Sequence, residues 1–272
     1  MLDLLFDQKF DAYFAAFRKN APLWVFVHVP KTAGSSLRGE LAGALRPEAN
    51  IFVDYNDPSK TYMESLDDAV RAFIQRHRET PHRFASGHIF PQHVDMIERA
   101  AGEIRRITML RQPAKRVISD YRYQCSPMHP GFEAFRERFP TIHDYLRQDE
   151  EANKATRYLV PYTLFQAGDV DACVDFIVRT YDFLGLQEMY PLSFRLLFAL
   201  IGERRFPTLR VRVNEGGEDA ELANDPAIIA AVEERNALDI AVHRALLARW
   251  RPVRDPMIEY LGTLPATAEQ RG

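Results

Sequence analysis

Cysteine is scarce in this 272-residue chain, which contains only Cys125 and Cys173. The two lie far apart, no CxxC pair is present, and neither cysteine stands in a cluster with histidines. The sequence therefore predicts neither a zinc site nor a disulfide framework, and we expect no metal. Two reduced thiols are typical of a reducing compartment, so we expect a cytoplasmic protein.

Long apolar runs are also absent, since no stretch approaches the roughly 18 apolar residues that a membrane-spanning helix needs. Residues 1–22 mix acidic with apolar side chains and have no basic segment at their start. This pattern is typical of an amphipathic helix and not of a signal peptide. We expect no membrane span.

Positive charge is not in excess, because 35 basic residues face 38 acidic ones and the net charge is −3. A general nucleic-acid-binding protein is usually basic, so we expect no nucleic-acid partner and only a local site for an anion. Lysine is the rarer base, with six residues against 29 arginines, so each lysine merits individual attention.

Short apolar segments alternate with amphipathic ones along the chain. Strands are predicted at residues 23–29, 50–55, 83–88, 104–110 and 183–186, and helices at 64–78, 113–121, 170–180, 190–201 and 226–250. The first run is apolar almost throughout, as in a strand buried on both faces of a parallel sheet. The order predicts one α/β domain over residues 1–272, with a mostly parallel central sheet flanked by helices.

Two segments lack a clear period. Residues 125–141 contain three prolines and several aromatic residues, and we interpret them as an irregular excursion on the substrate side of a site. Residues 264–272 are polar and are expected to form a frayed tail. The pattern at 226–250 fits either internal packing or a dimer, so it predicts no oligomeric state.

Residues 29–36, Val-Pro-Lys-Thr-Ala-Gly-Ser-Ser, join the first predicted strand to a helix. Parallel sheets bind ligands at the carboxyl ends of their strands, where a starting helix presents free N–H groups and its positive dipole end. Lys31 adds a compact charge, and Gly34 allows close backbone approach. Hydroxyl donors come from Thr32, Ser35 and Ser36. This pattern favours a phosphate-sized anion site, with an ordinary strand-to-helix turn as the alternative.

The loop is not the phosphate loop of nucleoside triphosphatases, G-x-x-x-x-G-K-[ST]. Lys31 precedes Gly34, and no glycine stands at the matching earlier position.

A second candidate anion site follows the strand at 104–110. Arg111 stands at the end of that strand, and Ser119 follows eight residues later on the next helix, sharing a face with Arg116. An arginine and a serine so placed can hold one phosphate. A solvated basic helix face is the alternative. Together the two sites predict a ligand with two separated anionic groups along one edge of the sheet.

The motifs PKTAGSS and R-x-P-x-x-R-x-x-S-x-Y, starting at Pro30 and Arg111, resemble those of sulfotransferases that use 3′-phosphoadenosine 5′-phosphosulfate (PAPS). The similarity is greatest to the carbohydrate branch that includes heparan sulfate 2-O-sulfotransferase. Weaker resemblances in later segments extend the similarity to this family over about residues 23–250. It implies a P-loop-like sulfotransferase fold.

By this resemblance, the 5′-phosphosulfate would be held by Lys31, Thr32, Ala33, Gly34, Ser35 and Ser36. Arg111 and Ser119 would hold the 3′-phosphate. Asn214 lies in a late segment that approaches the cofactor in relatives, without an assigned contact. Lys31 would also be catalytic, stabilising charge on the leaving oxygen.

A hydroxyl acceptor must lose its proton, and a histidine of near-neutral pKa can accept it. His88 follows the strand at 83–88, and its segment resembles the one that carries the catalytic histidine in the 2-O-sulfotransferase branch. Glu40 and Asp54 are rival bases. We interpret His28 as structural and place His93 on the acceptor side.

Aromatic and histidine side chains near the excursion suit either sugar stacking or packing, and packing is favoured for each of Tyr121, Tyr123, His129, Phe132 and Phe135. The expected function is transfer of a sulfuryl group from PAPS to a hydroxyl of a carbohydrate or glycolipid, by a sulfotransferase of the EC 2.8.2 type. The alternatives are a P-loop-like nucleotide-dependent kinase and a non-catalytic module that binds the nucleotide or a sulfated glycan.

Overall fold

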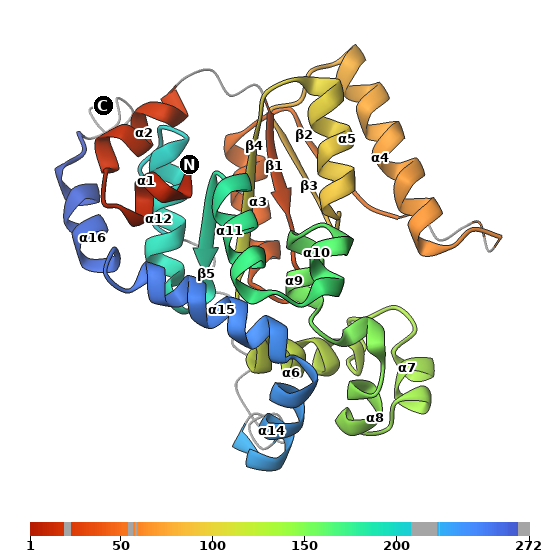
Figure 1. The fold of residues 1–272 in the computed structure, drawn as a ribbon. Coiled ribbons are helices and arrows are strands. Elements are labelled where there is room, and N and C mark those ends of the chain that lie inside the picture. The colour runs from red at the N-terminus through yellow and green to blue at the C-terminus, as the bar shows by residue number, and fades with distance from the viewer. Residues whose placement is uncertain (19–22, 54–56, 58, 208–221, 223, 266–272) are drawn as a thin grey trace.

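A five-stranded, all-parallel sheet forms the centre of the computed structural model, which describes residues 1–18, 23–53, 57, 59–207, 222 and 224–265 (Figure 1). The strand order is β2-β3-β1-β4-β5. The strands are β1 (Leu23–Val27), β2 (Glu48–Ile51), β3 (Phe84–Gly87), β4 (Ile104–Leu110) and β5 (Phe183–Leu186). The prediction of an α/β fold with a parallel central sheet is confirmed.

Burial explains which strands the sequence identifies well. All five residues of β1, the central strand, are buried, whereas the edge strand β2 alternates between exposed and buried residues. The strand predicted at 50–55 is displaced, because β2 begins at Glu48 and ends at Ile51. An edge strand this short has too few residues to show its period clearly.

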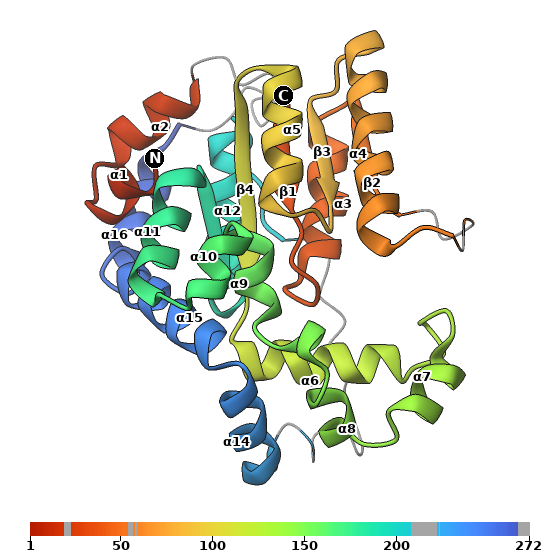
Figure 2. The same ribbon diagram turned by 45° about the vertical axis from the view of Figure 1, so that its right-hand side comes forward.

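Helices cover both faces of the sheet (Figure 2). One face carries α4 (Tyr62–Glu79), α5 (Pro91–Ala101) and α11 (Val170–Thr180), and the other carries α3 (Gly34–Ala44) and α12 (Tyr190–Leu200). The helices that connect consecutive strands, α3, α4, α5 and α11, lie on the sides that right-handed crossovers between parallel strands require. None of the described helices combines the length and apolar composition needed to cross a bilayer.

Below the carboxyl ends of the strands lies a helical layer with its own small core (Figure 2). It consists of α6 (Pro113–Gln124), α7 (Phe132–Arg138), α8 (Ile142–Leu146) and α14 (Pro226–Arg235). The segment 125–141, predicted to be irregular, therefore contains the helix α7. Its apolar residues pack into the small core at Phe135 and Phe139, which a search for one continuous period does not detect.

Two predicted helices are broken. The segment 1–22 contains α1 (Leu2–Phe6) and α2 (Phe10–Arg18), separated at Gln8, whose φ of 58° is left-handed. The segment 226–250 divides at Asn236 into α14 and α15 (Ala237–Trp250). The buried Asn236 amide donates to the Val232 carbonyl, 2.9 Å away, and its Oδ1 accepts from the Asn153 N–H at 3.0 Å. The Asp239 N–H donates to Asn153 Oδ1 at 3.0 Å, so side-chain hydrogen bonds hold the two helices together at the break.

Besides α7, five of the described helices were not predicted: α9 (Lys154–Leu159), α10 (Tyr162–Ala167), α16 (Arg254–Thr263), α5 and α8. The first two are short, and α16 ends just before the predicted tail. Most of that tail, residues 266–272, lies outside the described residues.

Candidate functional site

The loop between β1 and α3 has a strained backbone. Lys31 and Ala33 have φ values of 66° and 65°, in the left-handed region that favours glycine. Each costs about 1 kcal/mol in a non-glycine residue. The buried Thr32 between them donates from Oγ1 to the Val29 carbonyl at 2.8 Å. The loop is therefore held in one curved shape, and such strain concentrates at ligand sites.

Gly34 begins α3 directly against the ring of His28. A Cβ added at Gly34 would lie 2.2 Å from His28 Cδ2, so only glycine allows the helix to begin there. The next residues leave the first turn open, since Ser35 is exposed and Ser36 half-buried. This turn has no acidic residue. Its N–H groups and hydroxyls suit an anion.

The two predicted anion sites are neighbours in space. Arg111, directly after β4, donates from Nη1 to the Lys31 carbonyl at 3.2 Å. Lys31 Nζ lies 4.0 Å from the ring centroid of Tyr123 on α6. Ser119 is half-buried one helical turn before Tyr123, so it lies on the face of α6 that meets the loop.

Positive charge is concentrated at this junction. Burial lowers the pKa of Lys31, Asp120 opposes that shift, and the nearby Arg111 and Arg122 add to it. Burial also lowers the pKa of Arg111, where Glu188 opposes the shift and Arg116 and Arg122 add to it.

Several of these donors are unsatisfied. Arg111 Nε is buried and has no hydrogen-bond partner among the described residues, and the same holds for Nε and Nη2 of the fully buried Arg116. Buried donors are costly to leave unpaired. The accumulation of positive charge fits an anionic ligand beside Arg111.

The connection from β4 to α6 is anchored on Glu188, which follows β5. Its Oε1 accepts from the Gln112 N–H at 2.5 Å, and its Oε2 lies 3.4 Å from His243 Nε2 on α15. The Gln112 side chain accepts in turn from the Lys115 N–H at 2.7 Å. These contacts fix the segment that presents Arg111.

His88 follows β3 at the same edge of the sheet. Its Nδ1 lies 2.5 Å from the His28 carbonyl oxygen, which can only accept, so Nδ1 carries the proton and Nε2 keeps a lone pair. The side chain is exposed, yet desolvation by the surrounding protein lowers the pKa of the imidazole. A neutral imidazole with a free Nε2 is suited to accept a proton.

The ring of His28 lies 4.5 Å from that of His88 and stacks on Phe26 at 5.3 Å. Burial, with smaller effects from His88 and Arg38, lowers the pKa of His28 to about 3. His28 is therefore neutral and structural, as the sequence predicts: its ring supports Gly34 and its carbonyl orients His88.

Two other predicted side chains have different surroundings. His93 is buried, its Nδ1 accepts from the Phe90 N–H at 3.1 Å, and its Nε2 lies 3.0 Å from Asp67 Oδ1. It therefore caps α5 and does not line the acceptor side. Glu40 is paired with Arg205 at 3.9 Å. Asp54 and Asn214 lie outside the described residues.

The sequence reasoning missed three charged or polar side chains near His88. Asp120 raises the pKa of His88, Lys154 lowers it, and the ring of Tyr158 lies 6.3 Å from its ring. Lys154 is one of only six lysines, and Asp120 stands four residues after Arg116, a helical ion-pair spacing. These two features of the sequence were the signals that could have identified Lys154 and Asp120.

The aromatic residues near the excursion divide between two roles. Tyr121 and Phe135 pack in the small core, which confirms packing for both. Tyr123 instead underlies the Lys31 ammonium, an arrangement that favours a cation.

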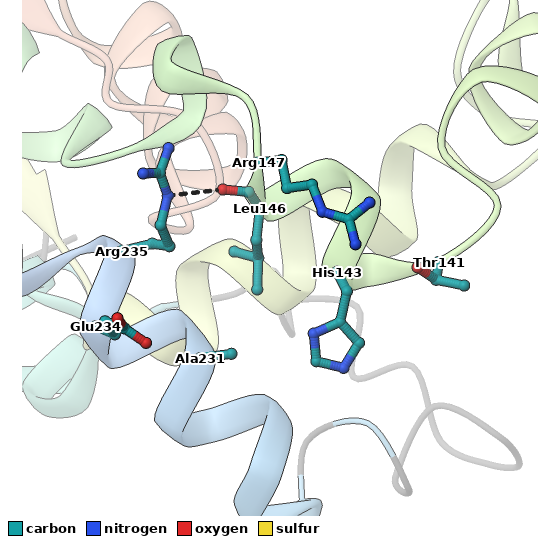
Figure 3. Close-up of a pocket in the computed structure, with 7 residues that line it drawn as sticks. All are labelled: Thr141, His143, Leu146, Arg147, Ala231, Glu234 and Arg235. Carbon is teal, nitrogen blue, oxygen red and sulfur yellow. Dashed lines mark hydrogen bonds between the residues drawn. The ribbon is translucent and has the colours of Figure 1, made fainter.

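A hollow of about 650 Å³ lies elsewhere, between α8 and α14 (Figure 3). It is lined by Thr141, His143, Leu146, Arg147, Ala231, Glu234 and Arg235. Arg147 pairs with Asp144 at 2.7 Å, and Arg235 pairs with Asp149 at 2.7 Å. Because its cations already have carboxylate partners, the hollow is a poorer anion site than the junction at Lys31. No group of three or more potential metal-ligating side chains occurs in the described part of the chain.

Comparison with known proteins finds structural likeness alone, since no family model and no curated protein matches the chain. A sulfotransferase from Alicyclobacillus acidocaldarius is 18% identical, with a TM-score of 0.44, over 85% of this chain and 100% of that one. The mouse sulfotransferase SULT7A1 complexed with PAP is 11% identical, with a TM-score of 0.33, over 78% of this chain and 68% of that one. At this level of similarity, the function must be argued from the site.

Proposed function

We propose that this protein is a sulfotransferase that moves a sulfuryl group from PAPS to a hydroxyl of a carbohydrate or glycolipid. The observation that carries the proposal is the contact between Arg111 and the Lys31 carbonyl. It brings the cationic ends of β1 and β4 together beside a strained loop and unsatisfied guanidinium donors. A nucleotide with an anionic group at each end matches this arrangement.

The residues present fit such a co-substrate. The phosphosulfate end would be held by the loop from Lys31 to Ser36, and the first turn of α3 contains no acidic residue. The 3′-phosphate would be held by Arg111 and Ser119, and the unpartnered Arg111 Nε supplies a donor for it. When bound, PAPS supplies the activated sulfuryl group.

The chain's own groups would act on both sides of the transfer. His88 Nε2 takes the proton of the acceptor hydroxyl, because Nδ1–H is committed to the His28 carbonyl. Lys31 stabilises negative charge as it develops on the leaving oxygen, and its contact with Tyr123 holds the ammonium in place.

A carbohydrate acceptor is supported by exposed aromatic side chains near His88. Ile51 pairs with Gly87 at the ends of β2 and β3, so Phe52 and His88 each directly follow one of two adjacent strands. Phe52 is 66% exposed and Tyr62, which interacts with Tyr158, is 39% exposed. Aromatic faces of this kind can stack against sugar rings.

Calorimetry with adenosine 3′,5′-bisphosphate (PAP) and with ATP tests the proposal. We expect PAP to bind more tightly, and transfer of labelled sulfate from PAPS to follow in a screen of sugars and glycolipids. Magnesium-dependent turnover of ATP would instead support a kinase. Tight PAP binding with no transfer to any acceptor would support a non-catalytic module.

A further inference from the structure

Asp120 is a buried carboxylate that directly follows Ser119 in the chain. It lies on α6 and is only 5% exposed. Its Oδ2 lies 3.4 Å from Arg116 Nη1 and 3.6 Å from Lys154 Nζ, and it accepts from the Tyr145 hydroxyl at 3.3 Å. One carboxylate thus joins α6 to α8 and α9.

The charge of Asp120 acts on both candidate catalytic groups. It raises the pKa of Lys31 on the leaving-group side and of His88 on the acceptor side. A buried negative charge this close to an anion site repels the anionic ligand. The Asp120 carboxylate therefore opposes nucleotide binding, and we ask what favourable function it has in the site.

The groups that face His88 show what that role is. The His28 ring and carbonyl come from the end of β1, Lys154 and Tyr158 from α9, and Asp120 from α6. The His28 carbonyl accepts from Nδ1–H and, like Asp120, favours the protonated ring. Lys154 disfavours it. Asp120 is the carboxylate in this set.

We propose that Asp120, which pairs with Lys154 at 3.6 Å, is a positioning residue that stabilises the imidazolium formed when His88 Nε2 accepts the acceptor's proton. The catalytic part of this inference rests on the proposed function. A base that becomes charged during the reaction is stabilised by a nearby negative charge, and Asp120 provides one without touching the ring. The same negative charge weakens the affinity for the anionic nucleotide.

The test is Asp120→Asn, which keeps the shape of the side chain and removes its charge. We expect NMR titration of the histidine signals to show that the pKa of His88 falls by roughly 0.5 pH unit or more. PAP affinity should be unchanged or severalfold higher, because a repulsive charge is gone. kcat should fall by about 10-fold or more, and the acid limb of the kcat/KM profile should move to lower pH.

Glu151→Gln is the matched control. Glu151 shares two partners with Asp120, since its Oε2 lies 2.5 Å from Lys154 Nζ and accepts from the Tyr145 hydroxyl. Among the described groups, it is not one that shifts the pKa of His88 or Lys31. We expect this variant to change the pKa of His88 far less than Asp120→Asn does.

Lys154→Gln tests the same pair from the other side. With the ammonium removed and Asp120 retained, the pKa of His88 should rise above the wild-type value, and this holds even if Asp120→Asn fails to fold. An unchanged pKa of His88 in both variants, or equal shifts in Asp120→Asn and Glu151→Gln, would overturn the proposal. So would parallel losses of PAP affinity and kcat in folded Asp120→Asn.

The NMR titration needs no nucleotide, so it separates the two levels of the argument. A wild-type chain that binds no PAP would refute the proposed function while leaving the electrostatic role of Asp120 open to measurement by the titration.

Discussion

Lys31 combines three properties at one position: a left-handed backbone, a carbonyl that accepts from Arg111, and an ammonium over Tyr123. The backbone roles survive truncation of the side chain, whereas the charge does not. Lys31→Ala should therefore reduce sulfate transfer by about 100-fold or more while the chain stays folded. Turnover assays with a thermal-melting control measure this. Near-normal turnover would refute the role given to the ammonium.

His88→Ala should separate chemistry from binding. The ring contacts the His28 carbonyl and ring and lies near Tyr158, and neither of these residues is among those proposed to hold the nucleotide. Sulfate transfer should be lost, and the affinity for PAP measured by calorimetry should stay close to that of wild type. A large loss of PAP affinity would assign His88 to nucleotide binding or folding.

His28 makes stability depend on pH. Its folded pKa of about 3 is below its ordinary value of 6.5, so the unfolded chain binds more protons between these two values. The free energy of unfolding should therefore fall as pH drops from about 6.5 towards 3, by up to about 5 kcal/mol from this residue. Urea unfolding at several pH values measures the slope. His28→Asn should flatten it, and an unchanged slope would contradict the assignment.

At the scale of elements, the start of α3 depends on Gly34. Gly34→Ala places a methyl group against the His28 ring, 2.2 Å from Cδ2, so the helix or the ring must move. We expect a lower melting temperature and weaker PAP binding. Gly39→Ala in the same helix is the control, because its added Cβ meets nothing within 4 Å. That variant should be stabilised by about 0.5–1 kcal/mol. Equal behaviour of the two variants would argue against the close fit at Gly34.

The elements differ in how far sequence patterns predict them. β4, α11 and β5 match their predicted bounds because buried strands show as short continuous apolar runs and strongly amphipathic helices have a clear period. The breaks at Gln8 and Asn236 were missed because each depends on one residue, through backbone conformation or a buried amide. Such local events leave the hydrophobic period intact.

At the scale of the whole molecule, the parallel sheet brings together residues that are far apart in the chain. Lys31, His88 and Arg111 follow β1, β3 and β4, which are adjacent in the sheet, so the rule that ligands bind at strand carboxyl ends correctly predicted their shared edge. Asp120 and Lys154 could not be predicted in the same way. Their meeting depends on how α6 packs against α9, which no strand register determines.

The central claim is that one edge of this sheet holds an adenine nucleotide by both of its anionic ends. Calorimetry with PAP and with AMP, on the wild-type chain and on Arg111→Ala, tests it most directly. The account predicts that wild type binds PAP at least about 10-fold more tightly than AMP, and that Arg111→Ala removes most of this difference while AMP affinity changes little. Equal affinities for PAP and AMP in the wild-type chain would contradict it.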